Sequence, residues 1–184
     1  MSVALCAIQK EVLIGVVLGD ASLERRKITH NTRLRLEQGH PKNTSYLWHL
    51  YGVFCNITGN TLLRFQVRKP DKRTGKVYST TTFTTLSLPC LNVYRDLFYP
   101  EGVKIVPAII GSLLTPMALA YWIADDGSLS SHNQTVLHTD GFTLSDVNVL
   151  RAVLLDRFKL RTRIVEKRPG QFLILIPVRQ EVSL

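Results

Sequence analysis

Two aspartates end two matched apolar stretches of the chain. The first stretch covers residues 11–21, EVLIGVVLGDA, and has its acid at Asp20. The second covers residues 117–127, MALAYWIADDG, and has its acid at Asp126. Two carboxylates brought to one point repel each other unless a cation lies between them, and carboxylate oxygens suit Mg²⁺. The pair therefore predicts a magnesium site, where the metal could activate a water molecule.

Both stretches are predicted to be buried helices, because they are apolar nearly all round. Pro116 stands just before the second stretch, where a helix tolerates proline best. Small residues lie four apart in each, at Gly15 and Gly19 and at Ala120 and Ala124. Residues with this spacing share one helix face, so the two backbones can pack closely and bring their terminal acids together.

The segments after the two helices repeat as well, because each half of the chain reads helix, strands, helix, strands. Period-two patterns predict strands over residues 32–38, 62–68, 77–88, 135–139, 160–166 and 172–176. Helices are predicted over residues 45–55 and 145–158, the second with Ser145 as its N-cap. The chain is therefore predicted to be an α+β protein with two pseudo-symmetric halves, residues 1–115 and 116–184, each with an antiparallel sheet.

One face of each predicted sheet is basic, within a chain that carries 23 Lys and Arg against 14 Asp and Glu. Residues 32–38 alternate between Arg33, Arg35 and Glu37 on one face and apolar residues or Gln38 on the other. In residues 62–68 the expected inward side chains include Phe65 and Val67. Such a surface can lie in the major groove of DNA, with arginines on phosphates and base edges. The expected DNA-contacting residues are Arg33, Arg35, Arg64, Gln66, Arg68, Lys72, Arg73, Arg161 and Arg163.

Several other classes of protein are disfavoured. Three scattered cysteines and five histidines show neither a disulfide framework nor a zinc-ligand spacing. Residues 105–124 are uncharged, but Pro107, Gly111 and Pro116 interrupt them, so a loop, a short helix and a buried helix fit better than a membrane span. The first ten residues do not read as a transit or secretory signal.

The two helices resemble the LAGLIDADG motif, with copies at residues 13–21 and 119–127. The setting of the second copy, LLTPMALAYWIADDGSLS, and the segments TRLRLEQ, DKRTGKVYS and LFYPEGVKIVP carry the resemblance over nearly the whole chain. The second copy departs at Tyr121 and Asp125, where small residues are usual. The chain thus resembles monomeric LAGLIDADG homing endonucleases encoded in organellar group I introns.

That resemblance implies a fold and a mechanism. Two antiparallel sheets would form a DNA-binding saddle, joined through the two packed motif helices. A single chain would bind double-stranded DNA and cut both strands with Mg²⁺, leaving short 3′ overhangs, in intron homing. Asp20 and Asp126 would be catalytic and would bind the metal together with Gly19 and Asp125, and Lys104 would be the active-site lysine. The implied compartment is the mitochondrion, with the chloroplast as the alternative.

Three alternative functions stay open. An RNA maturase would bind intron RNA with the same basic sheets but would not need the two carboxylates. A non-cleaving relic would bind DNA without the chemistry. The third alternative is an aspartic protease, prompted by the run Thr139-Asp140-Gly141, although a lone TDG has little weight.

The repeat also predicts that the second half lacks some elements of the first. An offset of 88 residues relates Pro89 to Pro177, and the same offset places the counterpart of Lys104 beyond the final residue, Leu184. The second half is therefore expected to lack its closing helix and its own lysine. Apolar side chains of the last strand, such as Leu173 and Leu175, are then expected to be partly exposed.

Overall fold

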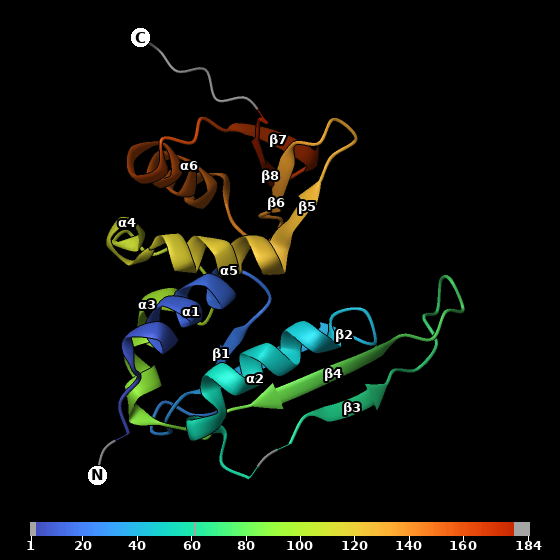
Figure 1. Cartoon of the computed structure of the whole chain (residues 1–184), viewed down its shortest axis with the longest axis vertical. Helices are drawn as coiled ribbons and strands as arrows, with labels where there is room; N and C mark the ends of the chain where they lie inside the picture. Colours follow the sequence, from blue (N-terminus) through green and yellow to red (C-terminus); the bar gives the residue numbers. More distant parts are fainter. Residues whose placement is uncertain (1–2, 61, 179–184) are drawn as a thin grey trace. The chain divides into compact units, whose positions relative to one another are not determined.

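The structure, a computed structural model, describes residues 3–60 and 62–178 and confirms the predicted α+β class (Figure 1). Two four-stranded antiparallel sheets lie in two compact units. Unit 1 comprises Met1–Lys10 and Asp20–Arg95, and unit 2 comprises Glu11–Gly19 and Asp96–Leu184. The expected division of the sequence repeat between residues 115 and 116 stays a prediction.

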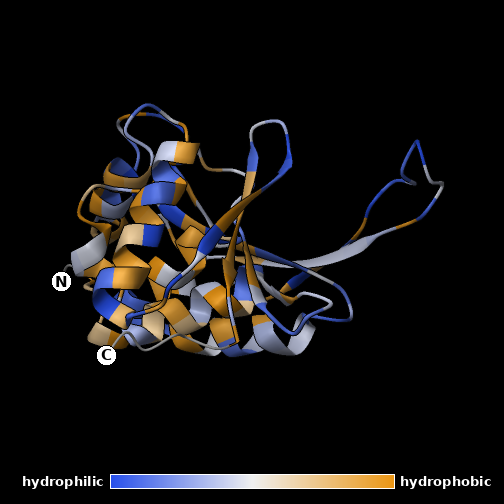
Figure 2. Ribbon diagram, turned by 90° about the horizontal axis from the view of Figure 1, so that it is seen from above, coloured by the Kyte–Doolittle hydropathy of each residue, from blue (hydrophilic) through white to orange (hydrophobic). Residues whose placement is uncertain are grey.

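Unit 1 is built on a sheet with the strand order β1-β2-β4-β3. Helix α2 lies along this sheet and buries Leu47, Leu50 and Phe54 against β2 and β4 (Figure 1). The connection from β3 to β4 extends beyond the sheet and ends in a hydrophilic tip (Figure 2). The elements are β1 Ser22–Glu24, β2 Arg33–Gly39, α2 Thr44–Thr58, β3 Arg64–Val67, β4 Ser79–Thr84, the 3-10 turn η1 Pro89–Leu91 and α3 Asn92–Phe98, which runs into unit 2.

Unit 2 repeats the same topology, with the strand order β5-β6-β8-β7 and α6 between its second and third strands. Most of α1, Ala7–Leu18, belongs to this unit. The remaining elements are α4 Ile110–Leu113, α5 Pro116–Asp126, β5 Gly127–Leu129, β6 Thr135–His138, α6 Leu144–Phe158, β7 Arg163–Arg168 and β8 Gln171–Ile176. The repeat seen in the sequence is therefore a repeat of helix, strand, strand, helix, strand, strand, in which α1 and α5 come first.

Several local predictions are confirmed. In β2, Leu34 and Leu36 are buried while Arg33 and Arg35 are only half-buried, as the alternation predicted. Residues 105–124 form a loop, the short α4 and the start of α5, which begins at Pro116. Within the described part of the chain, no helix has the length and apolarity to cross a membrane.

Two local predictions are wrong, one about the buried side chains of β3 and one about the N-cap of α6. Phe65 and Val67 are 56% and 57% exposed rather than inward, because β3 is the edge strand and α2 packs on β2 and β4. Helix α6 is capped by Thr143, not by Ser145. Thr143 accepts from the backbone N–H of Asp146, and the Asp146 carboxylate accepts from the backbone N–H of Thr143, which completes a capping box.

The predicted close packing of the two motif helices is confirmed, but on a different face of α5. A Cβ added at Gly15 would overlap the backbone carbonyl of Ala118. Ala120 and Ala124, the small residues expected at this contact, are exposed instead. The Ala118 carbonyl and the Cβ of Tyr121 face α1 at this point instead.

The start of α5 is also tied to α1. Thr115 is the N-cap of α5, and its side chain accepts from the backbone N–H of Ala118 at 3.1 Å. The same hydroxyl lies 2.5 Å from a carboxylate oxygen of Glu11 and donates to it. Cap and carboxylate together fix the register between the helices, which then determines which residues meet at their other ends.

Alanine at Gly15 is expected to destabilise the chain by about 1–3 kcal/mol, because the added methyl group meets backbone atoms that cannot move independently. Gly52 is the matched control, since it also lies inside a helix, in α2, but has nothing within 4 Å of an added Cβ. Gly52→Ala should therefore stabilise by up to about 1 kcal/mol. Urea unfolding followed by circular dichroism measures both. Equal effects of the two substitutions would contradict the close approach of α1 and α5.

Candidate active site and nucleic-acid interface

The C-terminal ends of α1 and α5 bring three of the predicted site residues together in unit 2. A Cβ added at Gly19, just after α1, would lie 2.5 Å from the Cβ of Asp125. The backbone carbonyl of Gly19 accepts a hydrogen bond from Lys104 Nζ at 2.9 Å. Asp126 is the last residue of α5 and follows Asp125 directly. The ammonium group of Lys104, the carbonyl oxygen of Gly19 and the Asp125 side chain thus lie together where the two helices end.

Lys104 reaches this point from a loop that is fixed at two places. The backbone N–H of Ile105 donates to the carbonyl of Phe98 at the end of α3, at 2.8 Å. The N–H of Val106 donates to Asp146 Oδ1, in the capping box of α6, at 3.2 Å. These bonds hold the residues that directly follow Lys104. Its half-buried side chain therefore has a defined anchor.

Asp20 comes next in the chain after Gly19 and belongs to unit 1. Gln38 Nε2, on β2, donates to Asp20 Oδ2 at 3.0 Å. Asn43 Nδ2 donates in turn to Gln38 Oε1 at 2.9 Å, so both ends of the Gln38 amide are used. The sequence placed Gln38 on the inner face of its strand but did not assign it this role. The signal was there, because a polar residue at a buried strand position needs a hydrogen-bond partner.

The chemistry of these ends is that of oxygen ligands beside an ammonium group. Carboxylate and carbonyl oxygens bind hard divalent cations, and Mg²⁺ is commonly held by one or two carboxylates together with substrate phosphate oxygens. Over residues 3–60 and 62–178, no group of three or more His, Cys, Asp or Glu side chains is placed to hold a metal ion. The predicted metal-ligand set therefore contains few carboxylates, and a backbone carbonyl oxygen would be a further ligand.

The open face of the first sheet collects four of the predicted DNA-contacting residues. Arg33 and Arg35 from β2 and Arg64 and Gln66 from β3 line one groove of about 480 Å³, together with the end of β4 and the residues after it. Lys72 and Arg73 lie apart from this groove, in the exposed turn after β3. Asp71 stabilises this turn, because its Oδ1 accepts the backbone N–H groups of Arg73 and Thr74 at 2.9 and 2.8 Å.

The second sheet differs in its basic residues. Arg163 begins β7 and is exposed, whereas Arg161 precedes the strand and lines a groove with Asn148 and Arg151 of α6. The prediction that residues 160–162 belong to this strand is wrong. Helix α6 holds them instead, through hydrogen bonds from Arg151 to the side chain and carbonyl of Thr162 at 3.3 and 3.1 Å.

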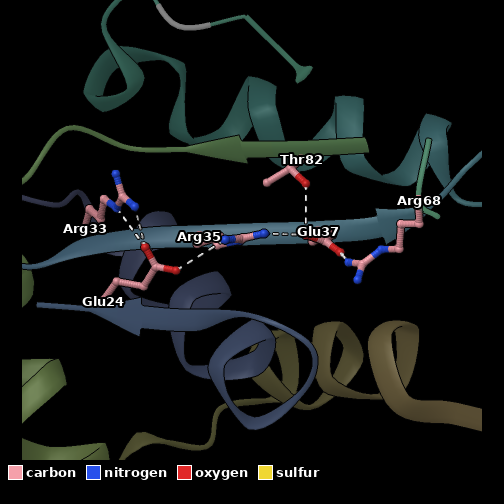
Figure 3. A network of polar contacts seen from close by, with 6 residues as sticks. All are labelled: Glu24, Arg33, Arg35, Glu37, Arg68 and Thr82. Atoms are coloured by element: carbon pink, nitrogen blue, oxygen red, sulfur yellow. Dashed lines mark hydrogen bonds and ion pairs between the residues drawn. The ribbon is translucent and has the colours of Figure 1, made fainter. Parts of the chain in front are cut away.

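The basic face of the first sheet also carries two carboxylates, which join its arginines into one row (Figure 3). Glu24 Oε2 accepts from Arg33 Nε and NH2 at 2.8 and 2.6 Å, and Glu24 Oε1 lies 3.6 Å from Arg35 NH1. Glu37 Oε2 accepts from Arg35 NH2 at 2.5 Å, and Glu37 Oε1 accepts from Arg68. The order is therefore Arg33, Glu24, Arg35, Glu37, Arg68. The sequence indicated which arginines share the face but not their pairing.

This pairing shifts the pKa of two residues in the row, Glu37 and Arg35. Partial burial by itself would raise the pKa of Glu37, but the hydrogen bond from Arg35, the charge of Arg68 and the hydroxyl of Thr82 outweigh it and hold the pKa below its ordinary value. The hydrogen bond to Glu37 correspondingly raises the pKa of Arg35. Glu37 and Arg35 are therefore both charged at neutral pH.

Glu37→Gln is expected to lower the free energy of unfolding by about 1 kcal/mol at pH 7. Because the pKa of Glu37 is lower in the folded chain than its ordinary 4.5, its contribution is present above that pH and lost as the pH falls through the folded value. The difference between parent and variant should therefore shrink as the pH falls below 4.5. Urea unfolding at pH 7 and over a series of lower pH values measures it. A stability difference that does not depend on pH would contradict its assignment to the ion pairs of Glu37. The control is Asp156→Asn, on the exposed surface of α6.

Comparison with known proteins gives consistent matches over most of the chain. The profile of the LAGLIDADG DNA endonuclease family matches residues 10–183. The chain is 29% identical over 168 residues to DNA endonuclease I-ChuI of Chlamydomonas applanata, covering 86% of this chain and 77% of that protein. It is 32% identical over 154 residues to cytochrome b mRNA maturase bI2 of Debaryomyces hansenii, covering 83% of this chain but only 57% of the maturase. The structure of homing endonuclease I-WcaI bound to its DNA recognition sequence is similar, with a TM-score of 0.85 and 27% identity over 95% of this chain and 77% of that one.

Proposed function

Because the chain belongs to the LAGLIDADG DNA endonuclease family, we propose that it is a site-specific double-stranded DNA endonuclease that acts in intron homing. It binds its target as a monomer and hydrolyses one phosphodiester on each strand. The observation that carries the proposal is the hydrogen bond from Lys104 Nζ to the carbonyl of Gly19 at 2.9 Å. It brings a positive charge to the end of the motif helix that leads into Asp20, where a scissile phosphate needs charge neutralisation.

The residues around this point fit a divalent cation, which we propose to be Mg²⁺. Asp20 and Asp126 would supply carboxylate oxygens, and Gly19 and Asp125 would complete the protein ligands. A carbonyl oxygen has two lone pairs, so that of Gly19 can accept from Lys104 and still be a ligand. When bound, such a cation lowers the pKa of a water molecule and stabilises the charge that develops on the phosphate and the leaving oxygen.

Each protein group has its own part in the reaction. The Gln38 amide, itself held by Asn43, orients the Asp20 carboxylate at 3.0 Å. Lys104 would neutralise the scissile phosphate or polarise the attacking water. The arginines of the two sheets would bind phosphates and read base edges in the major groove. This set consists of Arg33, Arg35, Arg64, Gln66, Arg68, Lys72, Arg73, Arg161 and Arg163.

A second candidate function is assistance in splicing the host intron, with intron RNA as the partner. The similarity to a cytochrome b mRNA maturase favours it, although the chain spans little more than half of that protein. The similarity to a cytochrome b mRNA maturase also supports the interpretation that this chain is encoded in an organellar intron. We propose the mitochondrion as the compartment. The two motif acids favour DNA cleavage as the main activity, since RNA binding alone does not need them.

Asp20→Asn and Asp126→Asn should each reduce double-strand cleavage by about 100-fold or more, because each removes a carboxylate from the reacting centre. DNA binding should be largely kept, since neither residue lies on the basic face. The assay is linearisation, with Mg²⁺, of a plasmid that carries the intronless junction of the host gene, alongside a gel-shift measurement of binding.

Asp156→Asn, on the exposed surface of α6, removes the same charge elsewhere and should cleave like the parent. Full cleavage by either motif variant would refute the two-acid mechanism. A parent chain that leaves this plasmid intact but promotes splicing of the host intron transcript would favour the maturase function instead.

A further inference from the structure

Glu37 joins Arg35 to Arg68 in the row of charged residues on the first sheet (Figure 3). One of its oxygens accepts from Arg35 at 2.5 Å and from Thr82 Oγ1 at 3.2 Å, and the other accepts from Arg68. These three donors come from β2, from β4 and from the residue just after β3. Glu37 therefore joins side chains across three neighbouring strands, and its own side chain is only 21% exposed.

A carboxylate at this place is unfavourable for binding DNA through phosphates alone. It repels the DNA backbone and occupies guanidinium donors that phosphates could use. Unit 1 carries only four acidic side chains, yet two of them, Glu24 and Glu37, lie among the arginines of this face. Their placement therefore needs a reason other than affinity.

We propose that Glu37 is a specificity-determining positioning residue, which acts through Arg35 and Arg68. An arginine presents five N–H donors in a planar fork. With one edge of the fork bound to Glu37, the plane of the guanidinium and the direction of its remaining donors are defined before DNA arrives. Such a fork can pair with the two acceptors of a guanine edge, whereas a freely rotating arginine binds any nearby phosphate. Glu24 holds the other end of the row in the same way, on Arg33.

Comparison of the two sheets predicts where in the target the effect occurs. Leu36 pairs with Phe83 in unit 1, and Leu137 pairs with Ile174 in unit 2, all four on the buried side of their sheets. The next residue along the strand is Glu37 in β2 but His138 in β6. His138 Nε2 lies 2.9 Å from Ser128 Oγ, and no arginine takes part in that contact. On the second sheet, the Asp140 carboxylate lies 3.6 Å from His138 Nδ1 and 3.8 Å from Lys167 Nζ. Because Glu37 and the arginines that it holds belong to the first sheet, their effect should fall in one half of the target.

The inference rests on the proposed recognition of double-stranded DNA but not on cleavage, so binding is the suitable measurement. The full chain is mixed with a pool of random-sequence duplexes, and the bound fraction is sequenced to give the base preference at each position. Affinity for the unselected pool is measured in parallel over a range of salt concentrations. The variants are Glu37→Gln, Glu37→Asp and the control Asp156→Asn, which changes the net charge by the same amount as Glu37→Gln.

Glu37→Gln should bind the unselected pool roughly threefold or more tightly, with a steeper salt dependence by about one phosphate contact. At the same time its base preference should flatten at adjacent positions in one half of the target only. Glu37→Asp keeps a carboxylate and should recover part of the preference, whereas a merely structural role would not distinguish the two. Asp156→Asn should keep the parent's base preference throughout.

Three results would overturn the inference. The first is an unchanged base preference in a folded Glu37→Gln variant, with folding checked by its thermal midpoint. The second is an undiminished effect of Glu37→Gln when Arg35 and Arg68 are both already alanine, since coupled residues must be non-additive. The third is a parent chain that binds no duplex, which would remove the proposed function as well, whereas the first two leave it intact.

Discussion

The carbonyl of Ala118 occupies the space that a side chain at Gly15 would need, and the part of the candidate site in unit 2 depends on this backbone-to-backbone contact. Glycine in a helix is unfavourable by about 1 kcal/mol, so its presence in α1 requires a packing reason of this kind. The contact sets the spacing of α1 and α5, and the hydrogen bond between Thr115 and Glu11 sets their register. Gly19 and Asp125 consequently meet at the other ends, within reach of Lys104.

Two kinds of support act on the residues that are proposed to function. One is a set of polar side chains within each unit: Gln38 and Asn43 hold the Asp20 carboxylate in unit 1, and Asp146 holds the loop after Lys104 in unit 2. The other is the charged row on the first sheet, where carboxylates fix the arginines. In both kinds of support, polar side chains restrict the orientation of the groups that are proposed to cleave or bind DNA. Preorganisation of this kind lowers the entropy lost on binding and sharpens discrimination.

Those features that depend on local pattern were predictable from the sequence. The apolar runs that end in Asp20 and Asp126 predicted two buried helices, and Pro116 marked the start of the second. The strict alternation over residues 33–38 identified the buried and open faces of β2. These patterns hold in the folded chain because the helix and strand periods determine, within a few residues, which side chains share a face.

Other features were decided only by the tertiary structure. Ala118 rather than Ala120 faces α1, and Phe65 stays exposed because an edge strand lacks a covering helix. Gln38 bonds to a carboxylate 18 residues earlier in the chain, and Glu37 bonds to an arginine 31 residues later. The sequence determined which residues these are and on which face of their own element they lie. It could not determine their partners, because strand order, helix rotation and the reach of long side chains depend on packing between segments distant in the chain.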